Sequence, residues 1–67
     1  MSPWKKIYVT RNHAEASIIQ GMLEENNISV QTMNKQDSSY LIGEIELYVP
    51  EHLVETAKQL VDRNLLN

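Results

Sequence analysis

Glu44 and Glu46 are two carboxylates that stand two residues apart on a predicted strand. Paired carboxylates can act as a general acid and a general base, and side chains at this spacing share one strand face about 7 Å apart. A working pair also needs burial or neighbouring charges that separate its two pKa values, and an open strand surface offers neither. We therefore interpret both glutamates as part of a solvated, acidic strand face.

Other residues with reactive side chains are few. The chain has no cysteine, so it can form neither disulfides nor thiolate metal sites. His13 and His52 are far apart in the sequence, each without a close ligand partner, and no serine stands in a recognisable nucleophile turn. We therefore expect a protein that is not an enzyme and that holds no metal or cofactor.

Arg11 and Asn12 lie where a predicted strand meets the N-terminus of a predicted helix, a place that favours anions. The glycine-rich turn that would bring the backbone close to a phosphate is missing. Asn12 also suits a helix N-cap, with Glu15 three residues later reaching back as in a capping box. Capping explains the segment better than anion binding, which stays as the weaker alternative.

The charges of the chain argue against nucleic acid as a partner. Its 67 residues include six basic and nine acidic ones, for a net charge of −3, and the basic residues are scattered along the sequence. Nucleic-acid binding needs a basic patch. No apolar run is long enough to span a membrane, and the apolar segment of a secretory signal is missing, so we expect a cytoplasmic protein without a membrane partner.

Hydrophobic periodicity divides residues 1–67, taken as a single domain, into a strand, a helix, two strands and a second helix. The alternation of apolar and polar side chains predicts strands at residues 5–10, 28–33 and 44–49. Residues 1–4 form a tail and residues 34–43 a variable loop. The first helix follows Asn12 and ends at Asn26 and Asn27, because asparagine tolerates a left-handed backbone, and Pro50 opens the second.

Apolar stripes predict which side of each helix is buried. The predicted stripes consist of Ala14, Ile18, Ile19, Met22 and Leu23 in the first helix, and of Leu53, Val54, Ala57, Leu60, Val61 and Leu65 in the second. Gly21 either lets the first helix approach the sheet closely or is a tolerated weak position, and the sequence favours neither interpretation.

These patterns predict an α+β fold, a two-layer ferredoxin-like sandwich with both helices on one face of a three-stranded antiparallel sheet. Connection rules place the third strand between the first two. The first strand would then be a free edge, where another chain could pair.

Two segments of the sequence, YVTRNHAEASIIQGMLEENNI and ELYVPEHLVETAKQL, resemble a family of small bacterial domains described as putative prokaryotic signal-transducing proteins. The residues that carry the resemblance are Asn12, Glu15, Ala16, Leu23, Glu24, Ile28, Val49, Pro50, Ala57 and Leu60. Members often have glycine where this chain has Asn27. The resemblance implies a fold similar to PII signalling proteins, a bacterial cytoplasmic setting and a regulatory role.

The sheet face turned away from the helices is a candidate contact surface. The alternation places on it Lys6, Tyr8, Thr10, Gln31, Met33, Glu44, Glu46 and Tyr48, with Trp4 in register. Aromatic residues and methionine are enriched at interfaces, although such side chains can equally shield a sheet surface. Aromatic sheet faces also bind single-stranded RNA, but the two glutamates would repel phosphates.

The loop over residues 34–43 corresponds to the partner-contacting loop of PII proteins by analogy alone. Its candidate contact residues are Lys35, Asp37, Ser38, Ser39 and Tyr40. The apolar run Tyr40, Leu41 and Ile42 fits the third strand or the edge of the core better than a binding knob.

We therefore expect a non-enzymatic regulatory or signal-transducing module that acts by protein contact, with homodimerisation as one form of that contact. The alternative is a PII-like module that senses a small molecule or an anion. The candidate partner-binding residues are Trp4, Tyr8, Met33, Lys35, Tyr40 and Tyr48, and the weaker anion-binding candidates are Arg11 and Asn12.

Overall fold

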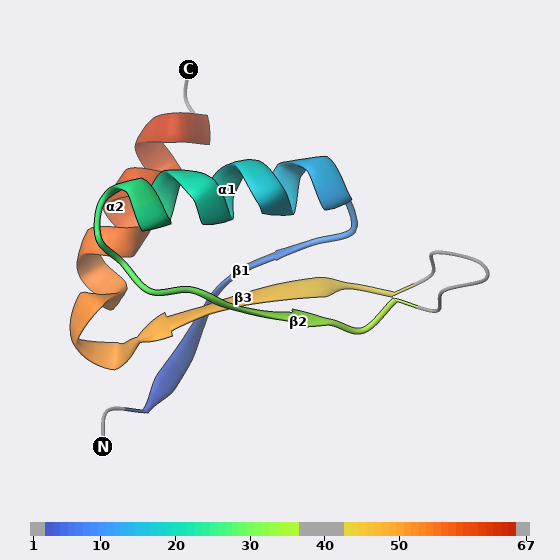
Figure 1. Ribbon diagram of the computed structural model, residues 1–67, viewed down its shortest axis with the longest axis horizontal. Helices are drawn as coiled ribbons and strands as arrows, with labels where there is room; N and C mark the ends of the chain where they lie inside the picture. Colours follow the sequence, from blue (N-terminus) through green and yellow to red (C-terminus); the bar gives the residue numbers. More distant parts are fainter. Residues whose placement is uncertain (1–2, 37–42, 66–67) are drawn as a thin grey trace.

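The computed structural model describes residues 3–36 and 43–65, with the side chain of Leu65 left out. The elements follow in the order β1 (Trp4–Thr10), α1 (His13–Glu25), β2 (Gln31–Asn34), β3 (Ile45–Pro50), the short 3-10 helix η1 (Glu51–Leu53) and α2 (Val54–Leu65). The strands form one antiparallel sheet in the order β1-β3-β2, and both helices lie on one side of it (Figure 1). The predicted α+β fold and its central third strand are confirmed.

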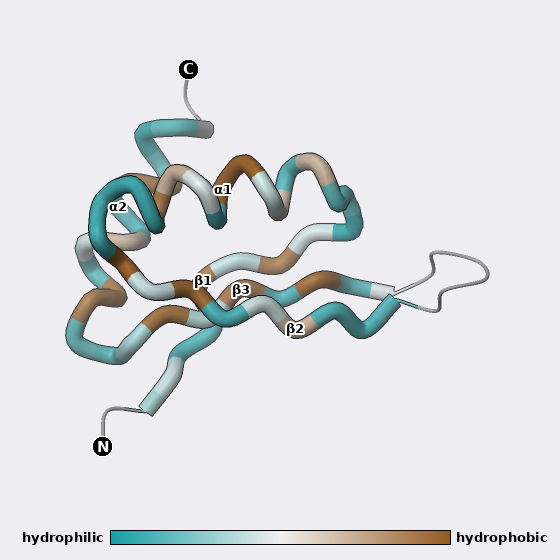
Figure 2. The backbone as a smooth tube through the Cα atoms, viewed as in Figure 1, coloured by the Kyte–Doolittle hydropathy of each residue, from teal (hydrophilic) through white to brown (hydrophobic). Residues whose placement is uncertain are grey.

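The core lies between β3 and the two helices. Its fully buried members on the strand are Ile45, Leu47 and Val49, which alternate with more polar residues along β3. The same alternation of apolar and hydrophilic residues is visible in Figure 2. Ala16, Ile19 and Leu23 of α1 cover these residues, as do Ala57 and Val61 of α2, while Ile28 closes the core beside α1.

Both ends of α1 lie where the sequence predicts them. Asn12 Oδ1 accepts from the backbone N–H of Glu15 at 3.0 Å, as an N-cap does. At the other end Asn27 has a φ of 64°, and the N–H of Ile28 donates to the Leu23 carbonyl at 3.0 Å. This is the Schellman arrangement, in which an asparagine replaces the usual glycine.

Other expectations for the helices need correction. Ile18 is 62% exposed and Ala14 is exposed, so the buried stripe of α1 runs through Ala16, Ile19 and Leu23 instead. Apart from the adjacent residues and the backbone of its own helix, no heavy atom lies within 4 Å of a Cβ built on Gly21, which favours the tolerated weak position over close approach. Pro50 ends β3 and the 3-10 turn follows it. The expected burial of Leu65 falls outside the described side chains.

A β-bulge in β1 changes which residues face the helices. Lys6 pairs with Tyr48, but Tyr8 pairs with the next residue along, Leu47, so Ile7 is extra. Because directly paired residues project from the same face, Tyr8 and Thr10 lie on the helix-covered side and Val9 lies on the other side, opposite Glu46. The expected placement of Tyr8 and Thr10 on the uncovered face is therefore wrong.

Candidate functional site: the open face of the sheet

The open face is the side of the sheet that the helices leave uncovered. The strand register assigns to it Trp4, Lys6 and Val9 of β1, Gln31 and Met33 of β2, and Glu46 and Tyr48 of β3. Three of these are large apolar side chains exposed to solvent, Trp4 at 39%, Val9 at 38% and Met33 at 48%. Trp4, Met33 and Tyr48 thus lie on the face expected for them, with Val9 in place of Tyr8.

Glu46 occupies the centre of the open face and is nevertheless buried. Its side chain is 6% exposed and contacts the side chains of Lys6 of β1 and of Lys35, the residue that follows β2. Lys6 Nζ lies 3.3 Å from Oε2 and Lys35 Nζ lies 3.3 Å from Oε1. Tyr48 donates its hydroxyl hydrogen to Oε1 at 2.8 Å. The interpretation of Glu46 as a solvated residue is therefore wrong, whereas Glu44 is exposed just before β3.

These contacts fix the ionisation of the central carboxylate. The hydrogen bond from Tyr48 is the largest cause of a lowered Glu46 pKa, burial opposes it, and the two lysines lower the pKa further. The same hydrogen bond raises the pKa of Tyr48. A general acid needs a carboxyl whose pKa is raised, so Glu46 is suited to anchoring the two ammonium groups and is a poor proton donor.

Tyr8 has a different environment from the one expected. Its ring packs against the core, and its hydroxyl donates to Glu15 Oε1 of α1 at 2.5 Å. This hydrogen bond, then burial and the negative charge of Glu15, raises the Tyr8 pKa to about 12. The Glu15 pKa falls for the same reason, helped by Thr10. Glu15 therefore ties α1 to β1 instead of completing the capping box, and the backbone N–H of Asn12 donates to Thr10 Oγ1.

The remaining predicted site residues are dispersed. Lys35 belongs to the ion cluster of the open face, which consists of Glu46, Lys6 and Lys35. The carbonyl of Arg11 accepts from Gln36 Nε2 at 2.9 Å, and Asn12 is used as the helix cap. Asp37, Ser38, Ser39, Tyr40, Leu41 and Ile42 lie outside the described residues.

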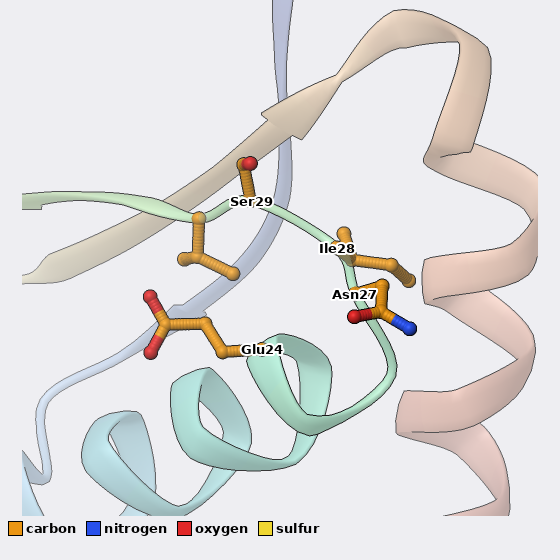
Figure 3. A pocket seen from close by; sticks show the side chains of 5 residues that line it. Glu24, Asn27, Ile28 and Ser29 are labelled. Carbon is orange, nitrogen blue, oxygen red and sulfur yellow. The ribbon is translucent and has the colours of Figure 1, made fainter.

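Two hollows occur away from the open face. One, of about 560 Å³, is lined by Glu24, Asn27, Ile28, Ser29 and Val30, where the end of α1 turns toward β2 (Figure 3). The other, of about 300 Å³, lies beside the exposed Ile18 and reaches Asn64 of α2. The sequence gives no signal for either hollow, because each forms between segments whose packing is set by the core.

Within the described part of the chain, no group of three or more histidine, cysteine or acidic side chains could hold a metal ion. No helix there is long and apolar enough to cross a membrane.

The comparisons with known proteins give one match. Among curated proteins nothing matches significantly. No solved structure does so either. Residues 4–64 match a family described as "Putative prokaryotic signal transducing protein". This range includes all the elements described above except the last residue of α2. The chain belongs to this family of prokaryotic proteins, whose name suggests a role in signal transduction.

Proposed function

We propose that this chain is a non-enzymatic signal-transducing module that acts by binding a protein partner on its open face. The observation that carries the proposal is the exposure of Trp4, Val9 and Met33. These side chains share a face with the ion cluster, in which Glu46 is already paired with two lysines. Exposed apolar side chains that gather on one face are typical of interaction sites, and aromatic residues and methionine are enriched there. The family name supports a signalling role.

The charges of the open face indicate the chemistry of the partner. The side chains of Lys6 and Lys35 are 47% and 55% exposed, whereas the carboxylate between them is 6% exposed. The outermost charges at the centre of the face are therefore two ammonium groups. A partner surface that combines carboxylates with apolar side chains complements this arrangement, and the exposed Glu44 at the entry to β3 marks one border of it.

Affinity capture followed by binding measurements with the purified partner tests this proposal. Val9→Asp places a like charge where the partner's carboxylates should lie, and should weaken binding at least tenfold. Ile18→Asp is the matched control, because Ile18 is an exposed apolar residue on α1 and its replacement should leave affinity unchanged. Affinity should also fall between about 50 and 300 mM salt, since exposed charge pairs are screened. Loss of binding in Ile18→Asp with retention in Val9→Asp would place the site on α1 and refute the proposal.

Sensing of a small molecule is the second candidate, and the hollow of about 560 Å³ beside Asn27 supports it, since ligand sites range from about 300 to 1,000 Å³. A metabolite present at about 100 times its dissociation constant would add about 2.7 kcal/mol of stability. Thermal-shift screening of nucleotides and metabolites should then give hits that Ser29→Trp, which fills the hollow, removes. Hits that survive this substitution would speak against the hollow as the sensing site.

A further inference from the structure

The two edges of the sheet differ in how they are protected. β1 carries two charged residues, Lys5 and Lys6, next to the bulge at Ile7, and charge and bulges both discourage pairing with another chain. β2 (Gln31–Asn34) has no charged residue, no proline and no bulge, and all four of its residues are exposed. The first strand was the expected site of pairing, but β2 is the less protected edge.

The hydrogen bonds of β2 show which backbone groups face outward. The N–H of Lys35 donates to the Glu44 carbonyl at 2.9 Å, and these two residues continue the β2–β3 register. Hydrogen-bonded and non-hydrogen-bonded pairs alternate along an antiparallel ladder. Met33 and Gln31 therefore bond inward to β3, whereas the N–H and C=O groups of Thr32 and Asn34 point to the open edge.

We propose that the β2 edge pairs antiparallel with the β2 edge of a second copy, in the register that places Met33 opposite its own counterpart. In this register Thr32 of each copy pairs with Asn34 of the other, so all outward groups of these two residues are bonded and the arrangement is a closed two-fold dimer. The two methionines form a non-hydrogen-bonded pair, in which side chains approach most closely, and the half-exposed side chain of each covers the other.

The charges of the two edges favour pairing of two copies through β2 over pairing through β1. Beyond Met33, the register places Gln31 of one copy opposite Lys35 of the other, so no like charges meet. A pairing through β1 would instead bring Lys5 and Lys6 of one copy close to the same lysines of the other, and like charges opposite each other destabilise a strand pair.

The dimer goes beyond the proposed function and does not depend on it. Pairing along the sheet edge joins two three-stranded sheets into one of six strands. The dimer contact covers Met33, whereas Trp4 and Val9 on the far strands stay free to bind a partner. The contact is short, below the size of standard stable interfaces, so the dimer should be weak and concentration-dependent.

Cysteine cross-linking tests the register, because the native chain has no cysteine. Cα atoms in a non-hydrogen-bonded pair lie about 4.5 Å apart, which a disulfide can bridge. Met33→Cys should therefore oxidise to a covalent dimer at least tenfold faster than Val9→Cys, the matched control on the same face. Equal rates for the two variants would overturn the proposed register.

Sedimentation equilibrium tests the dimer itself in the native chain. The weight-average mass should rise toward twice that of the monomer as the concentration approaches the millimolar range. Met33→Lys, which places two ammonium groups opposite each other, should stay monomeric, whereas Val9→Lys should behave like the native chain. A native chain that is monomeric throughout, or a dimer lost equally in both variants, would overturn the proposal while leaving the protein-contact function open to its own test.

Discussion

Glu46 shows that the role of a single residue depends on side chains from other strands. The alternation along β3 correctly predicts the face on which Glu46 lies. It could not predict burial, because the residues that cover the carboxylate come from β1 and from the end of β2 and are distant in the sequence. The N-cap role of Asn12 and the left-handed backbone of Asn27 could be predicted, since both depend on residues close in the sequence.

The ion cluster predicts a dependence of stability on pH. The folded Glu46 pKa is lowered, with the Tyr48 hydrogen bond as the first cause, so its contribution is fully present above the unfolded value of about 4.3 and is lost as the pH falls through the folded value. Glu46→Gln should melt at a lower temperature than the native chain at pH 7, and the difference should shrink below about pH 4. Thermal unfolding followed by circular dichroism measures this.

Glu44→Gln serves as the control for acid sensitivity, because Glu44 is exposed just before β3 and lies outside both helices. Its melting temperature should follow that of the native chain across the same pH range. A difference between the native chain and Glu46→Gln that stays constant down to pH 2 would contradict the role of the ionised carboxylate.

At the scale of elements, the sequence predicts type and order well and boundaries less well. The predicted second strand begins at Ile28, whereas β2 begins at Gln31. The difference arises because the N–H of Ile28 donates to the Leu23 carbonyl of α1 and its side chain packs in the core. The extra residue in β1 could not be predicted, since a bulge is defined by two strands together and period-2 alternation is read from one.

The two glycines should respond in opposite directions to alanine. Gly21 lies inside α1 with open space around a new Cβ, so Gly21→Ala should stabilise the protein by about 0.5–1 kcal/mol through helix propensity. Gly43 has a φ of 119°, and a Cβ there would meet the Lys35 carbonyl oxygen at 2.6 Å. Gly43→Ala should therefore destabilise by at least about 1 kcal/mol. Urea unfolding measures both values, and a loss of stability in Gly21→Ala would contradict the open surroundings of that site.

The overall fold could be predicted because connection rules leave few ways to arrange three strands and two helices. The uncovered side of the sheet follows from the single apolar face of each strand, which places both helices on the same side. The identity of the residues displayed there does not, since it depends on the bulge.

The small core makes the protein sensitive to a single substitution. Leu47 is fully buried at the centre of the sheet, and truncation of such a residue costs about 2–5 kcal/mol. A chain of this length has a total stability of about 3–10 kcal/mol, so Leu47→Ala should unfold in a much lower urea concentration or be unfolded in buffer. Met33→Ala, on the exposed strand β2, should change the stability by no more than about 0.5 kcal/mol. Comparable losses in both variants would contradict the placement of the core.

The bulge at Ile7 determines which side chains of the second half of β1 lie on the open face. If β1 kept all of its residues but paired without the bulge, Ile7 would lie opposite Leu47, and every following residue of the strand would exchange its inner or outer face. Tyr8 would then be presented to solvent and Val9 would be withdrawn, without a single change of residue type. The bulge therefore decides which side chains of β1 a partner on the open face can contact.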